Sequence, residues 1–175
     1  MSLAKFFMPV LALALTGCAS YSWRSAVPEE LRAVAVPVFR NASEVTGLGS
    51  VVTRQVLREL QREGTFRVTS LDDCTIEVQG EILTASAPTV AYERRTGARL
   101  REHRLTARAK VSFVDRKAGR ILVDAREYTA ETTFLINDDL LTGERDASGR
   151  LAEDLARQIV DDLLMAAAGN VKKEP

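Results

Sequence analysis

The chain has 175 residues, with 24 basic and 24 acidic side chains and one histidine, so its formal net charge is zero. A chain of this length suits one compact domain. The charge balance gives no basis for bulk attraction to nucleic acid, and we expect no nucleic-acid partner.

The amino terminus is typical of a secretion signal. Lys5 precedes the apolar stretch 6–15, which is shorter than the roughly 20 residues that a membrane-spanning helix needs. The quartet at 15–18, LTGC, resembles the lipobox of bacterial lipoprotein precursors. That resemblance implies a diacylglycerol on the Cys18 sulfur, cleavage after Gly17 and acylation of the new amine, so that fatty acids such as palmitate anchor the chain to a membrane. An ordinary secretory signal with a chance cysteine is the alternative.

These features divide the chain into four expected parts. Residues 1–17 are predicted to be the signal peptide, 18–30 the acylated linker, 31–169 a single domain and 170–175 a tail. Once Cys18 is a thioether, Cys74 has no intramolecular partner, which excludes a disulfide framework. Cys74 lies beside an alternating segment and is expected to be a small buried apolar residue.

The first half of the domain predicts a strand followed by a helix. The β-branched run at 31–39 indicates a buried strand whose ladder Pro37 limits or places at an edge. At 47–64 apolar residues recur every four positions, which predicts an amphipathic helix that ends at Gly64. Thr46 or Ser50 is the predicted N-cap of this helix.

The second half predicts a sheet and a second helix. The segment 65–70 is a short strand, and three long strands at 75–82, 105–113 and 120–134 form a meander with turn signals at 94–99 and 115–119. Gly80 indicates a bulge or close packing, and the alternation slips near Glu127 and Tyr128. We expect 135–149 to be a loop and 150–169 a helix.

This order predicts an α+β fold, in which two helices pack on one face of a four- to five-stranded, mixed and mainly antiparallel sheet. The first strand and the strand at 65–70 are expected to pair in parallel through a right-handed crossover. Because only one side of each long strand is apolar, both helices should cover the same face of this two-layer sandwich.

Little in the sequence indicates catalysis. His103 is expected to be a solvent-facing strand residue, and the sequence contains no Cys/His set with metal-ligand spacing and no nucleotide or hydrolase motif. The acidic pairs at 72–73, 138–139 and 161–162 are consistent with solvated surface groups. We therefore predict a non-enzyme without a metal or cofactor.

One basic segment, 92–104, is a candidate binding site. Its arginines are Arg94, Arg95, Arg99, Arg101 and Arg104. Guanidinium groups bind phosphate or carboxylate with two parallel hydrogen bonds, so a cluster at the tip of a long hairpin could bind a polyanion. A solubilising turn with local ion pairs to Glu93 and Glu102 is the alternative.

Several segments together resemble the LptE family of lipopolysaccharide-assembly lipoproteins. The resemblance covers most of the chain after Cys18 and rests on VAVPVFRN (34–41), Gly47-Leu48, LREL and EGTFRV within 57–68, IEVQGEI (76–82), DRKAGRIL (115–122) and LAEDLARQIVDDLL (151–164). It departs from the family at Asn41-Ala42-Ser43 and Gly49-Ser50, which puts little in doubt about the fold.

The resemblance implies a Gram-negative outer-membrane lipoprotein with two helices on a small sheet. Such proteins plug the β-barrel translocon LptD, help it to fold and assist lipopolysaccharide delivery to the cell surface. The implied partners are therefore an LptD-like barrel, lipopolysaccharide and the membrane that holds the anchor, with the domain facing the periplasm or the barrel lumen. Lipopolysaccharide, which carries phosphates, makes the five arginines candidate lipopolysaccharide-binding residues. Ala19 after Cys18 favours the outer membrane by analogy with enterobacterial sorting.

Two other functions stay open. The start of the domain is also similar to that of CsgG-like lipoproteins and of lipoproteins that activate peptidoglycan synthases, which implies secretion-pore assembly or enzyme activation. A lipid or glycan hydrolase ranks third, and the sequence supplies no candidate residues for it.

Overall fold

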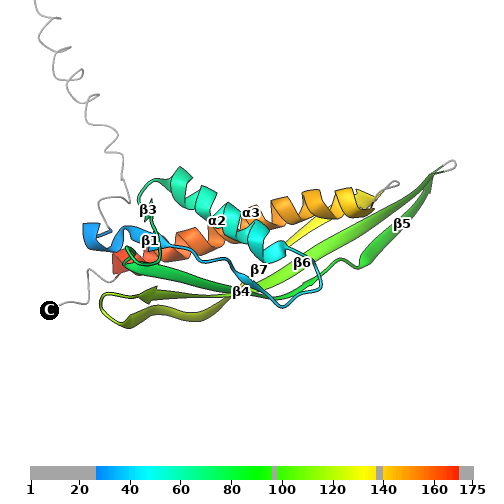
Figure 1. The fold of residues 1–175 in the computed structure, drawn as a ribbon. Coiled ribbons are helices and arrows are strands. Elements are labelled where there is room, and N and C mark those ends of the chain that lie inside the picture. The colour runs from blue at the N-terminus through cyan, green and yellow to red at the C-terminus, as the bar shows by residue number, and fades with distance from the viewer. Residues whose placement is uncertain (1–26, 96–97, 137–139, 170–175) are drawn as a thin grey trace, which may run out of the picture.

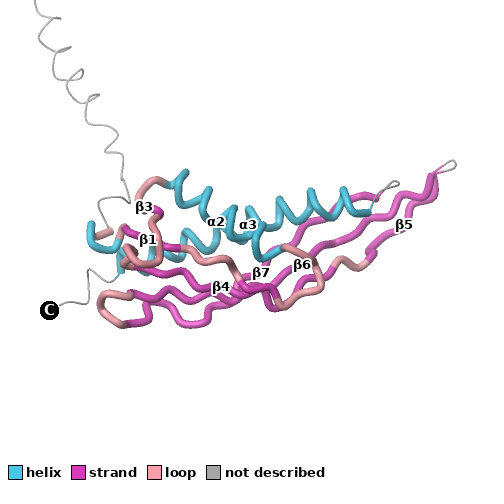
Figure 2. Tube along the Cα trace, in the orientation of Figure 1, coloured by secondary structure: helices cyan, strands magenta, loops and turns pink. Residues whose placement is uncertain are grey.

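The computed structural model describes residues 27–95, 98–136 and 140–169, which form a two-layer α+β arrangement (Figure 1). One mixed sheet forms the first layer, and two helices in contact with each other cover one of its faces (Figure 2). Apolar residues from one side of the long strands and from both helices form a continuous core. The predicted fold class is confirmed, because each element buries its single apolar side against the other layer.

The described residues form seven strands that occupy five positions across the sheet. They are β1 (Ala33–Ala35), β2 (Arg40–Asn41), β3 (Arg67–Val68), β4 (Ile76–Ser86), β5 (Thr89–Arg95), β6 (Ala98–Asp115) and β7 (Arg120–Ile136). β4 and β5 follow one another along one edge of β6, and β7 pairs with the other edge. β1 and β2 share the free edge of β4, and β3 pairs in parallel with β1 as expected.

The predicted strand at 31–39 is interrupted, because the chain leaves the ladder between β1 and β2. Pro37 has no N–H to donate there, and the Phe39 side chain turns into the core. The Phe39 N–H donates to Thr53 Oγ1 at 2.9 Å, and the Phe39 ring lies on the space that a side chain at Gly80 would fill. Of the two expectations for Gly80, close packing is therefore the one that the structure shows.

The first helix, α2 (Leu48–Glu63), agrees closely with the predicted range. At its carboxyl end Gly64 has φ 79° and donates its N–H to the Leu60 carbonyl at 3.1 Å, which is the expected glycine termination. The predicted cap is wrong: the N-cap is Gly47, with φ 77°, and neither Thr46 nor Ser50 caps the helix with its side chain. The backbone at this position has a positive φ, in the left-handed region, and glycine adopts this conformation without strain.

The predicted loop at 135–149 is wrong. β7 continues to Ile136, and the second helix, α3 (Leu140–Gly169), begins ten positions earlier than predicted. Gly143 and Gly149 suggested a loop, since each disfavours a helix by about 1 kcal/mol. Ala147 and Leu151 are fully buried, so the apolar stripe of α3 continues through this region and packing outweighs local propensity.

The predicted meander contains an additional strand, β5, between β4 and β6. The turn after β6 is found as predicted, with Gly119 at φ 64°. The irregularity expected near Glu127 and Tyr128 lies slightly earlier in β7, where Ala125 has φ 46° and its N–H donates to Ser112 Oγ at 2.9 Å. This local bulge follows from the extra residue that β7 accommodates opposite β6.

Candidate interaction surface

The sheet face turned away from α2 and α3 is polar. Along β6, alternate residues from Leu105 to Phe113 are buried against the helices, so the residues between them belong to the opposite face. We call this opposite face the outer polar face; it comprises Gln79, Glu81, Thr84 and Ser86 of β4, Arg104, Thr106, Arg108, Lys110 and Ser112 of β6, and Glu127, Thr129, Glu131 and Thr133 of β7. Hydroxyl and charged groups thus replace the apolar residues that a third layer would require.

Charges on the outer polar face are arranged so that they compensate one another. Lys110 lies opposite Glu81 on one side and Glu127 on the other. Arg108 Nη1 is 3.7 Å from Glu127 Oε2, and both side chains are about half exposed. Exposed pairs of this kind contribute about 1 kcal/mol or less to stability. Their main effect is a hydrophilic surface of nearly neutral charge that suits contact with another polar surface.

The outer edge of β7 is partly blocked by side chains of α3. Gln158 Nε2 donates to the Thr129 carbonyl at 3.2 Å, and Arg150 Nη2 donates to the Thr133 carbonyl at 3.1 Å. These bonds occupy carbonyl groups that an added strand would need. The face of the sheet is therefore a better candidate for partner contact than this edge.

The register of β5 and β6 divides the five candidate arginines. The side chains of Arg94, Arg95, Arg99 and Arg101 lie outside the described residues, whereas Arg104 is exposed. Arg94 is paired with Arg99, and Arg95 is paired with Ala98. Residues directly opposite share a face, and neighbours along a strand alternate. Positions 94, 99 and 101 therefore belong to one face of the hairpin, and positions 95 and 104 to the other.

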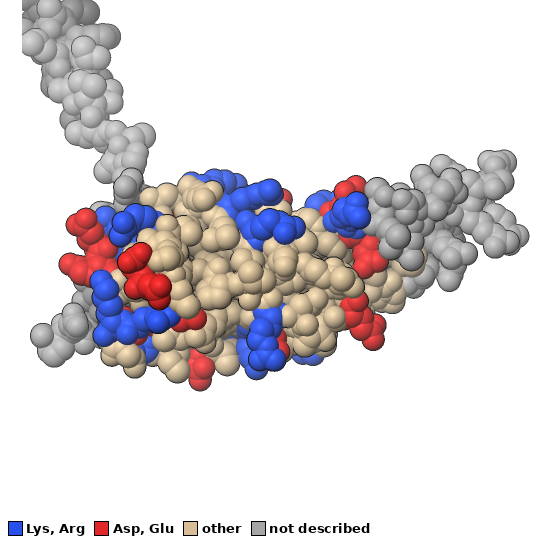
Figure 3. All heavy atoms as spheres, viewed as in Figure 1, with Lys and Arg blue, Asp and Glu red and all other residues tan. Residues whose placement is uncertain are grey.

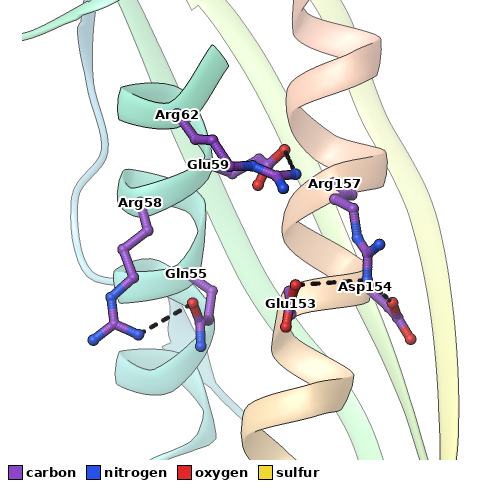
Figure 4. Close-up of polar contacts among 7 residues, drawn as sticks. All are labelled: Gln55, Arg58, Glu59, Arg62, Glu153, Asp154 and Arg157. Atoms are coloured by element: carbon purple, nitrogen blue, oxygen red, sulfur yellow. Dashed lines mark hydrogen bonds and ion pairs between the residues drawn. The ribbon is translucent and has the colours of Figure 1, made fainter. Parts of the chain in front are cut away.

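Several charged side chains on the helix layer are paired within their own helix (Figure 4). Arg62 lies 2.6 Å from Glu59, Arg157 lies 2.6 Å from Asp154, and the Arg58 guanidinium donates to Gln55 at 3.4 Å. The hydrogen bond and charge of Glu59 raise the pKa of the Arg62 guanidinium. Figure 3 shows basic and acidic side chains in small groups around an uncharged central band, not in one pole of either sign.

His103 and Cys74, the two residues considered for catalysis, are both packed against other parts of the fold. His103 is half-buried, which corrects the expectation of a solvent-facing residue: its ring centroid is 5.5 Å from that of Phe134, and Nδ1 is 3.0 Å from the Ala87 carbonyl. Cys74 is 5% exposed as predicted, and its Sγ donates to the Leu71 carbonyl at 3.2 Å. Burial raises the pKa of this thiol, which keeps it protonated and unreactive.

Two of the acidic pairs can be placed. Asp72 and Asp73 are exposed in a turn, where Asp73 accepts a hydrogen bond from Ser70 at 2.8 Å. Asp162 joins α3 to β7, because its Oδ2 accepts from Arg126 at 2.6 Å and from Tyr128 at 2.8 Å. The pair at 138–139 lies outside the described residues.

Two open cavities adjoin the first turns of α3, with volumes of about 690 and 620 Å³. The residues that line these two cavities include no histidine, cysteine or lysine. Within residues 27–95, 98–136 and 140–169 no group of three His, Cys, Asp or Glu side chains could hold a metal ion. No helix in these ranges is long and apolar enough to cross a bilayer.

The geometry defines a two-layer α+β domain with an uncovered polar sheet face. Its fold is similar to crystal structures of a candidate lipoprotein from Caulobacter crescentus (TM-score 0.53, 17% identity, covering 83% of this chain and 98% of that one) and of a Xanthomonas campestris protein (TM-score 0.56, 9% identity, 81% and 88%). A Chlamydia trachomatis protein is similar as well (TM-score 0.52, 12% identity, 77% and 96%). At these identities the likeness concerns the fold alone. No curated protein matches the sequence.

The model of the LptE lipopolysaccharide-assembly family matches residues 31–163, and the chain belongs to this family. The resemblance inferred from the sequence segments is thereby confirmed, and the role in lipopolysaccharide assembly follows from it. The family consists of non-enzymatic outer-membrane lipoproteins, which supports the prediction that the chain is not an enzyme. Cys18 and the signal segment lie outside the described residues.

Proposed function

We propose that this chain is a lipid-anchored outer-membrane lipoprotein that plugs an LptD-like β-barrel, assists assembly of that barrel and takes part in lipopolysaccharide delivery to the cell surface. The observation that carries the proposal is the outer polar face. The lumen of a large membrane barrel is polar, so a plug needs a hydrophilic surface of balanced charge. Membership in the lipopolysaccharide-assembly family supports the same role.

The proposed anchor is Cys18, acylated after removal of residues 1–17. Residues 18–30 then link the lipid to the domain at 31–169, and residues 170–175 form a tail. The described end of this linker supports a firm connection, because Val27 is buried in the core. We expect Cys18→Ala to abolish acylation and release the domain from membranes. Persistent palmitate labelling of this variant would show that the anchor lies elsewhere.

Site-specific crosslinking tests which surface meets the barrel. A photo-crosslinking residue at Arg108 lies on the outer polar face, and the same residue at Arg58 on α2 is the matched control on the helix layer. After purification from native Gram-negative membranes, the Arg108 probe is expected to capture a large β-barrel protein in higher yield than the Arg58 probe. Equal or reversed yields would contradict the assignment of the outer polar face.

The same purification separates the alternatives. Recovery of a penicillin-binding protein would favour a peptidoglycan-synthase activator, and recovery of a secretion pore would favour a CsgG-like role. Recovery of a barrel of the LptD type supports the plug. A hydrolase requires turnover of a lipid or glycan, which we expect to be absent.

The hairpin of β5 and β6 is the proposed contact for lipopolysaccharide phosphates, and Figure 1 shows it projecting past the start of α3. The register supports Arg94, Arg99 and Arg101 as one binding group, because like charges directly opposite are unfavourable until an anion binds them. Neutralising these three with glutamine should weaken lipopolysaccharide binding about tenfold or more with little change in melting temperature. The matched control neutralises Arg95 and Arg104. Equal losses in both variants would assign the hairpin a general charge effect instead of a shared site.

A further inference from the structure

A single row of paired residues crosses the whole sheet near the point where the described chain begins. Val34 of β1 is paired with Val68 of β3 and with Ile76 of β4. Ile76 is paired in turn with Asp115 of β6, and Asp115 with Arg120 of β7. Figure 1 shows the carboxyl end of α3 and the turn between β6 and β7 at the same end of the domain. We call this end the linker end; it comprises residues 27–34, 67–76, 114–122 and 162–169.

Exposed large apolar side chains gather at the linker end. Among the described residues these side chains are Val38, Leu71, Ile121 and Met165, with exposed fractions of 68%, 42%, 59% and 61%. Leu71 lies in the turn after β3, and Ile121 is the second residue of β7. Met165 lies three positions beyond Asp162, the residue that bonds α3 to the first half of β7. Isolated apolar residues are common on protein surfaces, but here three of the four lie at one end, and only Val38 lies elsewhere, between β1 and β2.

The outer side of the sheet changes character at the linker end. Val114 of β6 is directly opposite Ile121 of β7. Because Phe113 is buried against the helices, its neighbour Val114 belongs to the outer side, and so does Ile121. The outer polar face thus gives way to an apolar pair beyond Ser112. Contact with a polar surface does not account for this pair.

The charges at the linker end compensate one another or are negative. Both arginines of the turn after β6 lie close to carboxylates: Arg116 is 3.2 Å from Glu77, and Arg120 is 3.4 Å from Asp115. The acidic pairs at 29–30 and 72–73 are exposed. Attraction to anionic lipids requires an excess of basic residues near the membrane surface. The apolar side chains are therefore the groups that can favour a lipid surface at this end.

The length of the chain before the described residues limits how far the linker end can lie from a bilayer. This step rests on the proposed function, in which Cys18 carries the lipid. Cys18 precedes Val27 by nine positions, and nine residues span at most about 30 Å when fully extended. Val27 is buried in the core, so the domain itself begins there. The anchor therefore keeps the linker end, and no other part of the domain, close to the lipid headgroups.

We infer that the linker end rests on the surface of a zwitterionic phospholipid leaflet, with the side chains of Leu71, Ile121 and Met165 inserted at the boundary between headgroups and acyl chains. Apolar side chains at this depth add to the binding energy of a lipid anchor in proportion to the apolar area that they bury. The contact also fixes the direction of the domain, because the hairpin of β5 and β6 lies at the opposite end (Figure 1).

The test is quenching of tryptophan emission by phosphatidylcholine whose acyl chains carry bromine. Trp23 is the one tryptophan of the chain, so Ile121→Trp in a Trp23→Phe background carries a single reporter at the linker end. Val38→Trp in the same background is the matched control, since Val38 is equally apolar and exposed but lies outside the linker end. The full-length chain, purified from native membranes, is placed in barrel-free vesicles. Emission of the Ile121→Trp variant is expected to be quenched about threefold more strongly, because bromine acts only at short range and the reporter lies at the acyl-chain boundary.

Further substitutions show whether the apolar side chains cause the contact. Leu71→Ser together with Met165→Ser should lower the quenching of the Ile121→Trp reporter about twofold or more, because less apolar area is inserted. Val38→Ser is the matched control and should leave this quenching unchanged. Equal quenching of the two reporters overturns the inference, as does quenching that the double serine variant leaves intact. Quenching that appears only after phosphatidylglycerol is added also overturns it, because the attraction would then be electrostatic.

A separate measurement distinguishes this inference from the proposed anchor. Palmitate labelling of the native chain reports acylation of Cys18, whereas quenching reports contact of the folded domain with lipid. A labelled chain whose Ile121→Trp reporter is not quenched overturns the contact and leaves the anchor intact. Quenching in a chain without the label supports the contact and refutes the anchor.

Discussion

Substitution of Gly80 by alanine should destabilise the domain, although alanine is normally the better strand residue. A Cβ added at Gly80 would meet Cε2, Cδ2 and Cζ of the Phe39 ring, the last at 2.5 Å. Cβ atoms in proteins essentially never lie this close to another side chain. The Phe39 ring is part of the closely packed core, so it has little room to move. The ring or the strand must therefore shift.

The expected magnitude follows from two opposed effects. Overpacking a core typically costs about 1–3 kcal/mol. Replacing glycine in a strand stabilises by about 0.5–1 kcal/mol, because the unfolded chain loses conformational freedom. The clash outweighs the entropy term, and we expect a net loss of about 1–2 kcal/mol, which corresponds to roughly 2–8 °C in melting temperature at this chain length.

The assay is urea unfolding of the full-length chain followed by far-ultraviolet circular dichroism. Gly149→Ala is the matched control, because Gly149 lies in α3 with nothing within 4 Å of its added Cβ. That variant should gain up to about 1 kcal/mol, the helix propensity difference. Phe39→Ala in the Gly80→Ala background should cost less than in the native background, since the clash is then absent. A Gly80→Ala variant as stable as the native chain, or additive losses in the double variant, would refute the reasoning.

Three further predictions use the same unfolding assay or a simple chemical probe. Thr53→Val keeps the side-chain shape but leaves the buried Phe39 N–H without its acceptor, so it should cost about 1–3 kcal/mol, and an unchanged midpoint would contradict this. Burial and the hydrogen bond to Asp162 raise the pKa of the Tyr128 hydroxyl above its usual 10. The stability that the protonated hydroxyl contributes is therefore present below about pH 10 and is lost as the pH rises through the folded-state pKa. Tyr128→Phe should reduce the loss of stability in alkaline solution, and an unaltered pH profile would contradict the assignment. Burial also raises the pKa of the Cys74 thiol, so alkylation at neutral pH should be slow in the folded chain and should accelerate in urea; equally rapid reaction in both states would show that the thiol is accessible.

The elements that the sequence predicts well are those in which local pattern and tertiary packing agree. The helix at 47–64 has a complete apolar stripe and a terminating glycine, and the structure gives α2 the same limits within one residue. The long strands alternate because one face meets the helices and the other meets solvent. For these segments the burial pattern is already encoded in residue spacing.

The predictions that failed concern residues whose conformation is set by distant partners. The first turns of α3 contain Gly143 and Gly149, and only the packing of Ala147 and Leu151 shows why they are helical. The half-buried position of His103 depends on Phe134 of another strand. Nothing in the local sequence signals either contact, because each joins elements far apart in the chain.

The register of the hairpin changes how its arginines can act. In the sequence, residues 92–104 form one basic segment, but the pairing of Arg94 with Arg99 and of Arg95 with Ala98 divides its arginine positions between two faces. Positions 94, 99 and 101 share one face and are therefore the group that we propose for a phosphate. Arg104 belongs instead to the outer polar face, where it pairs in register with Thr133 of β7. A partner that contacts the outer polar face would therefore meet Arg104, and a phosphate bound at the hairpin would not, so the two proposed contacts can be removed independently of each other.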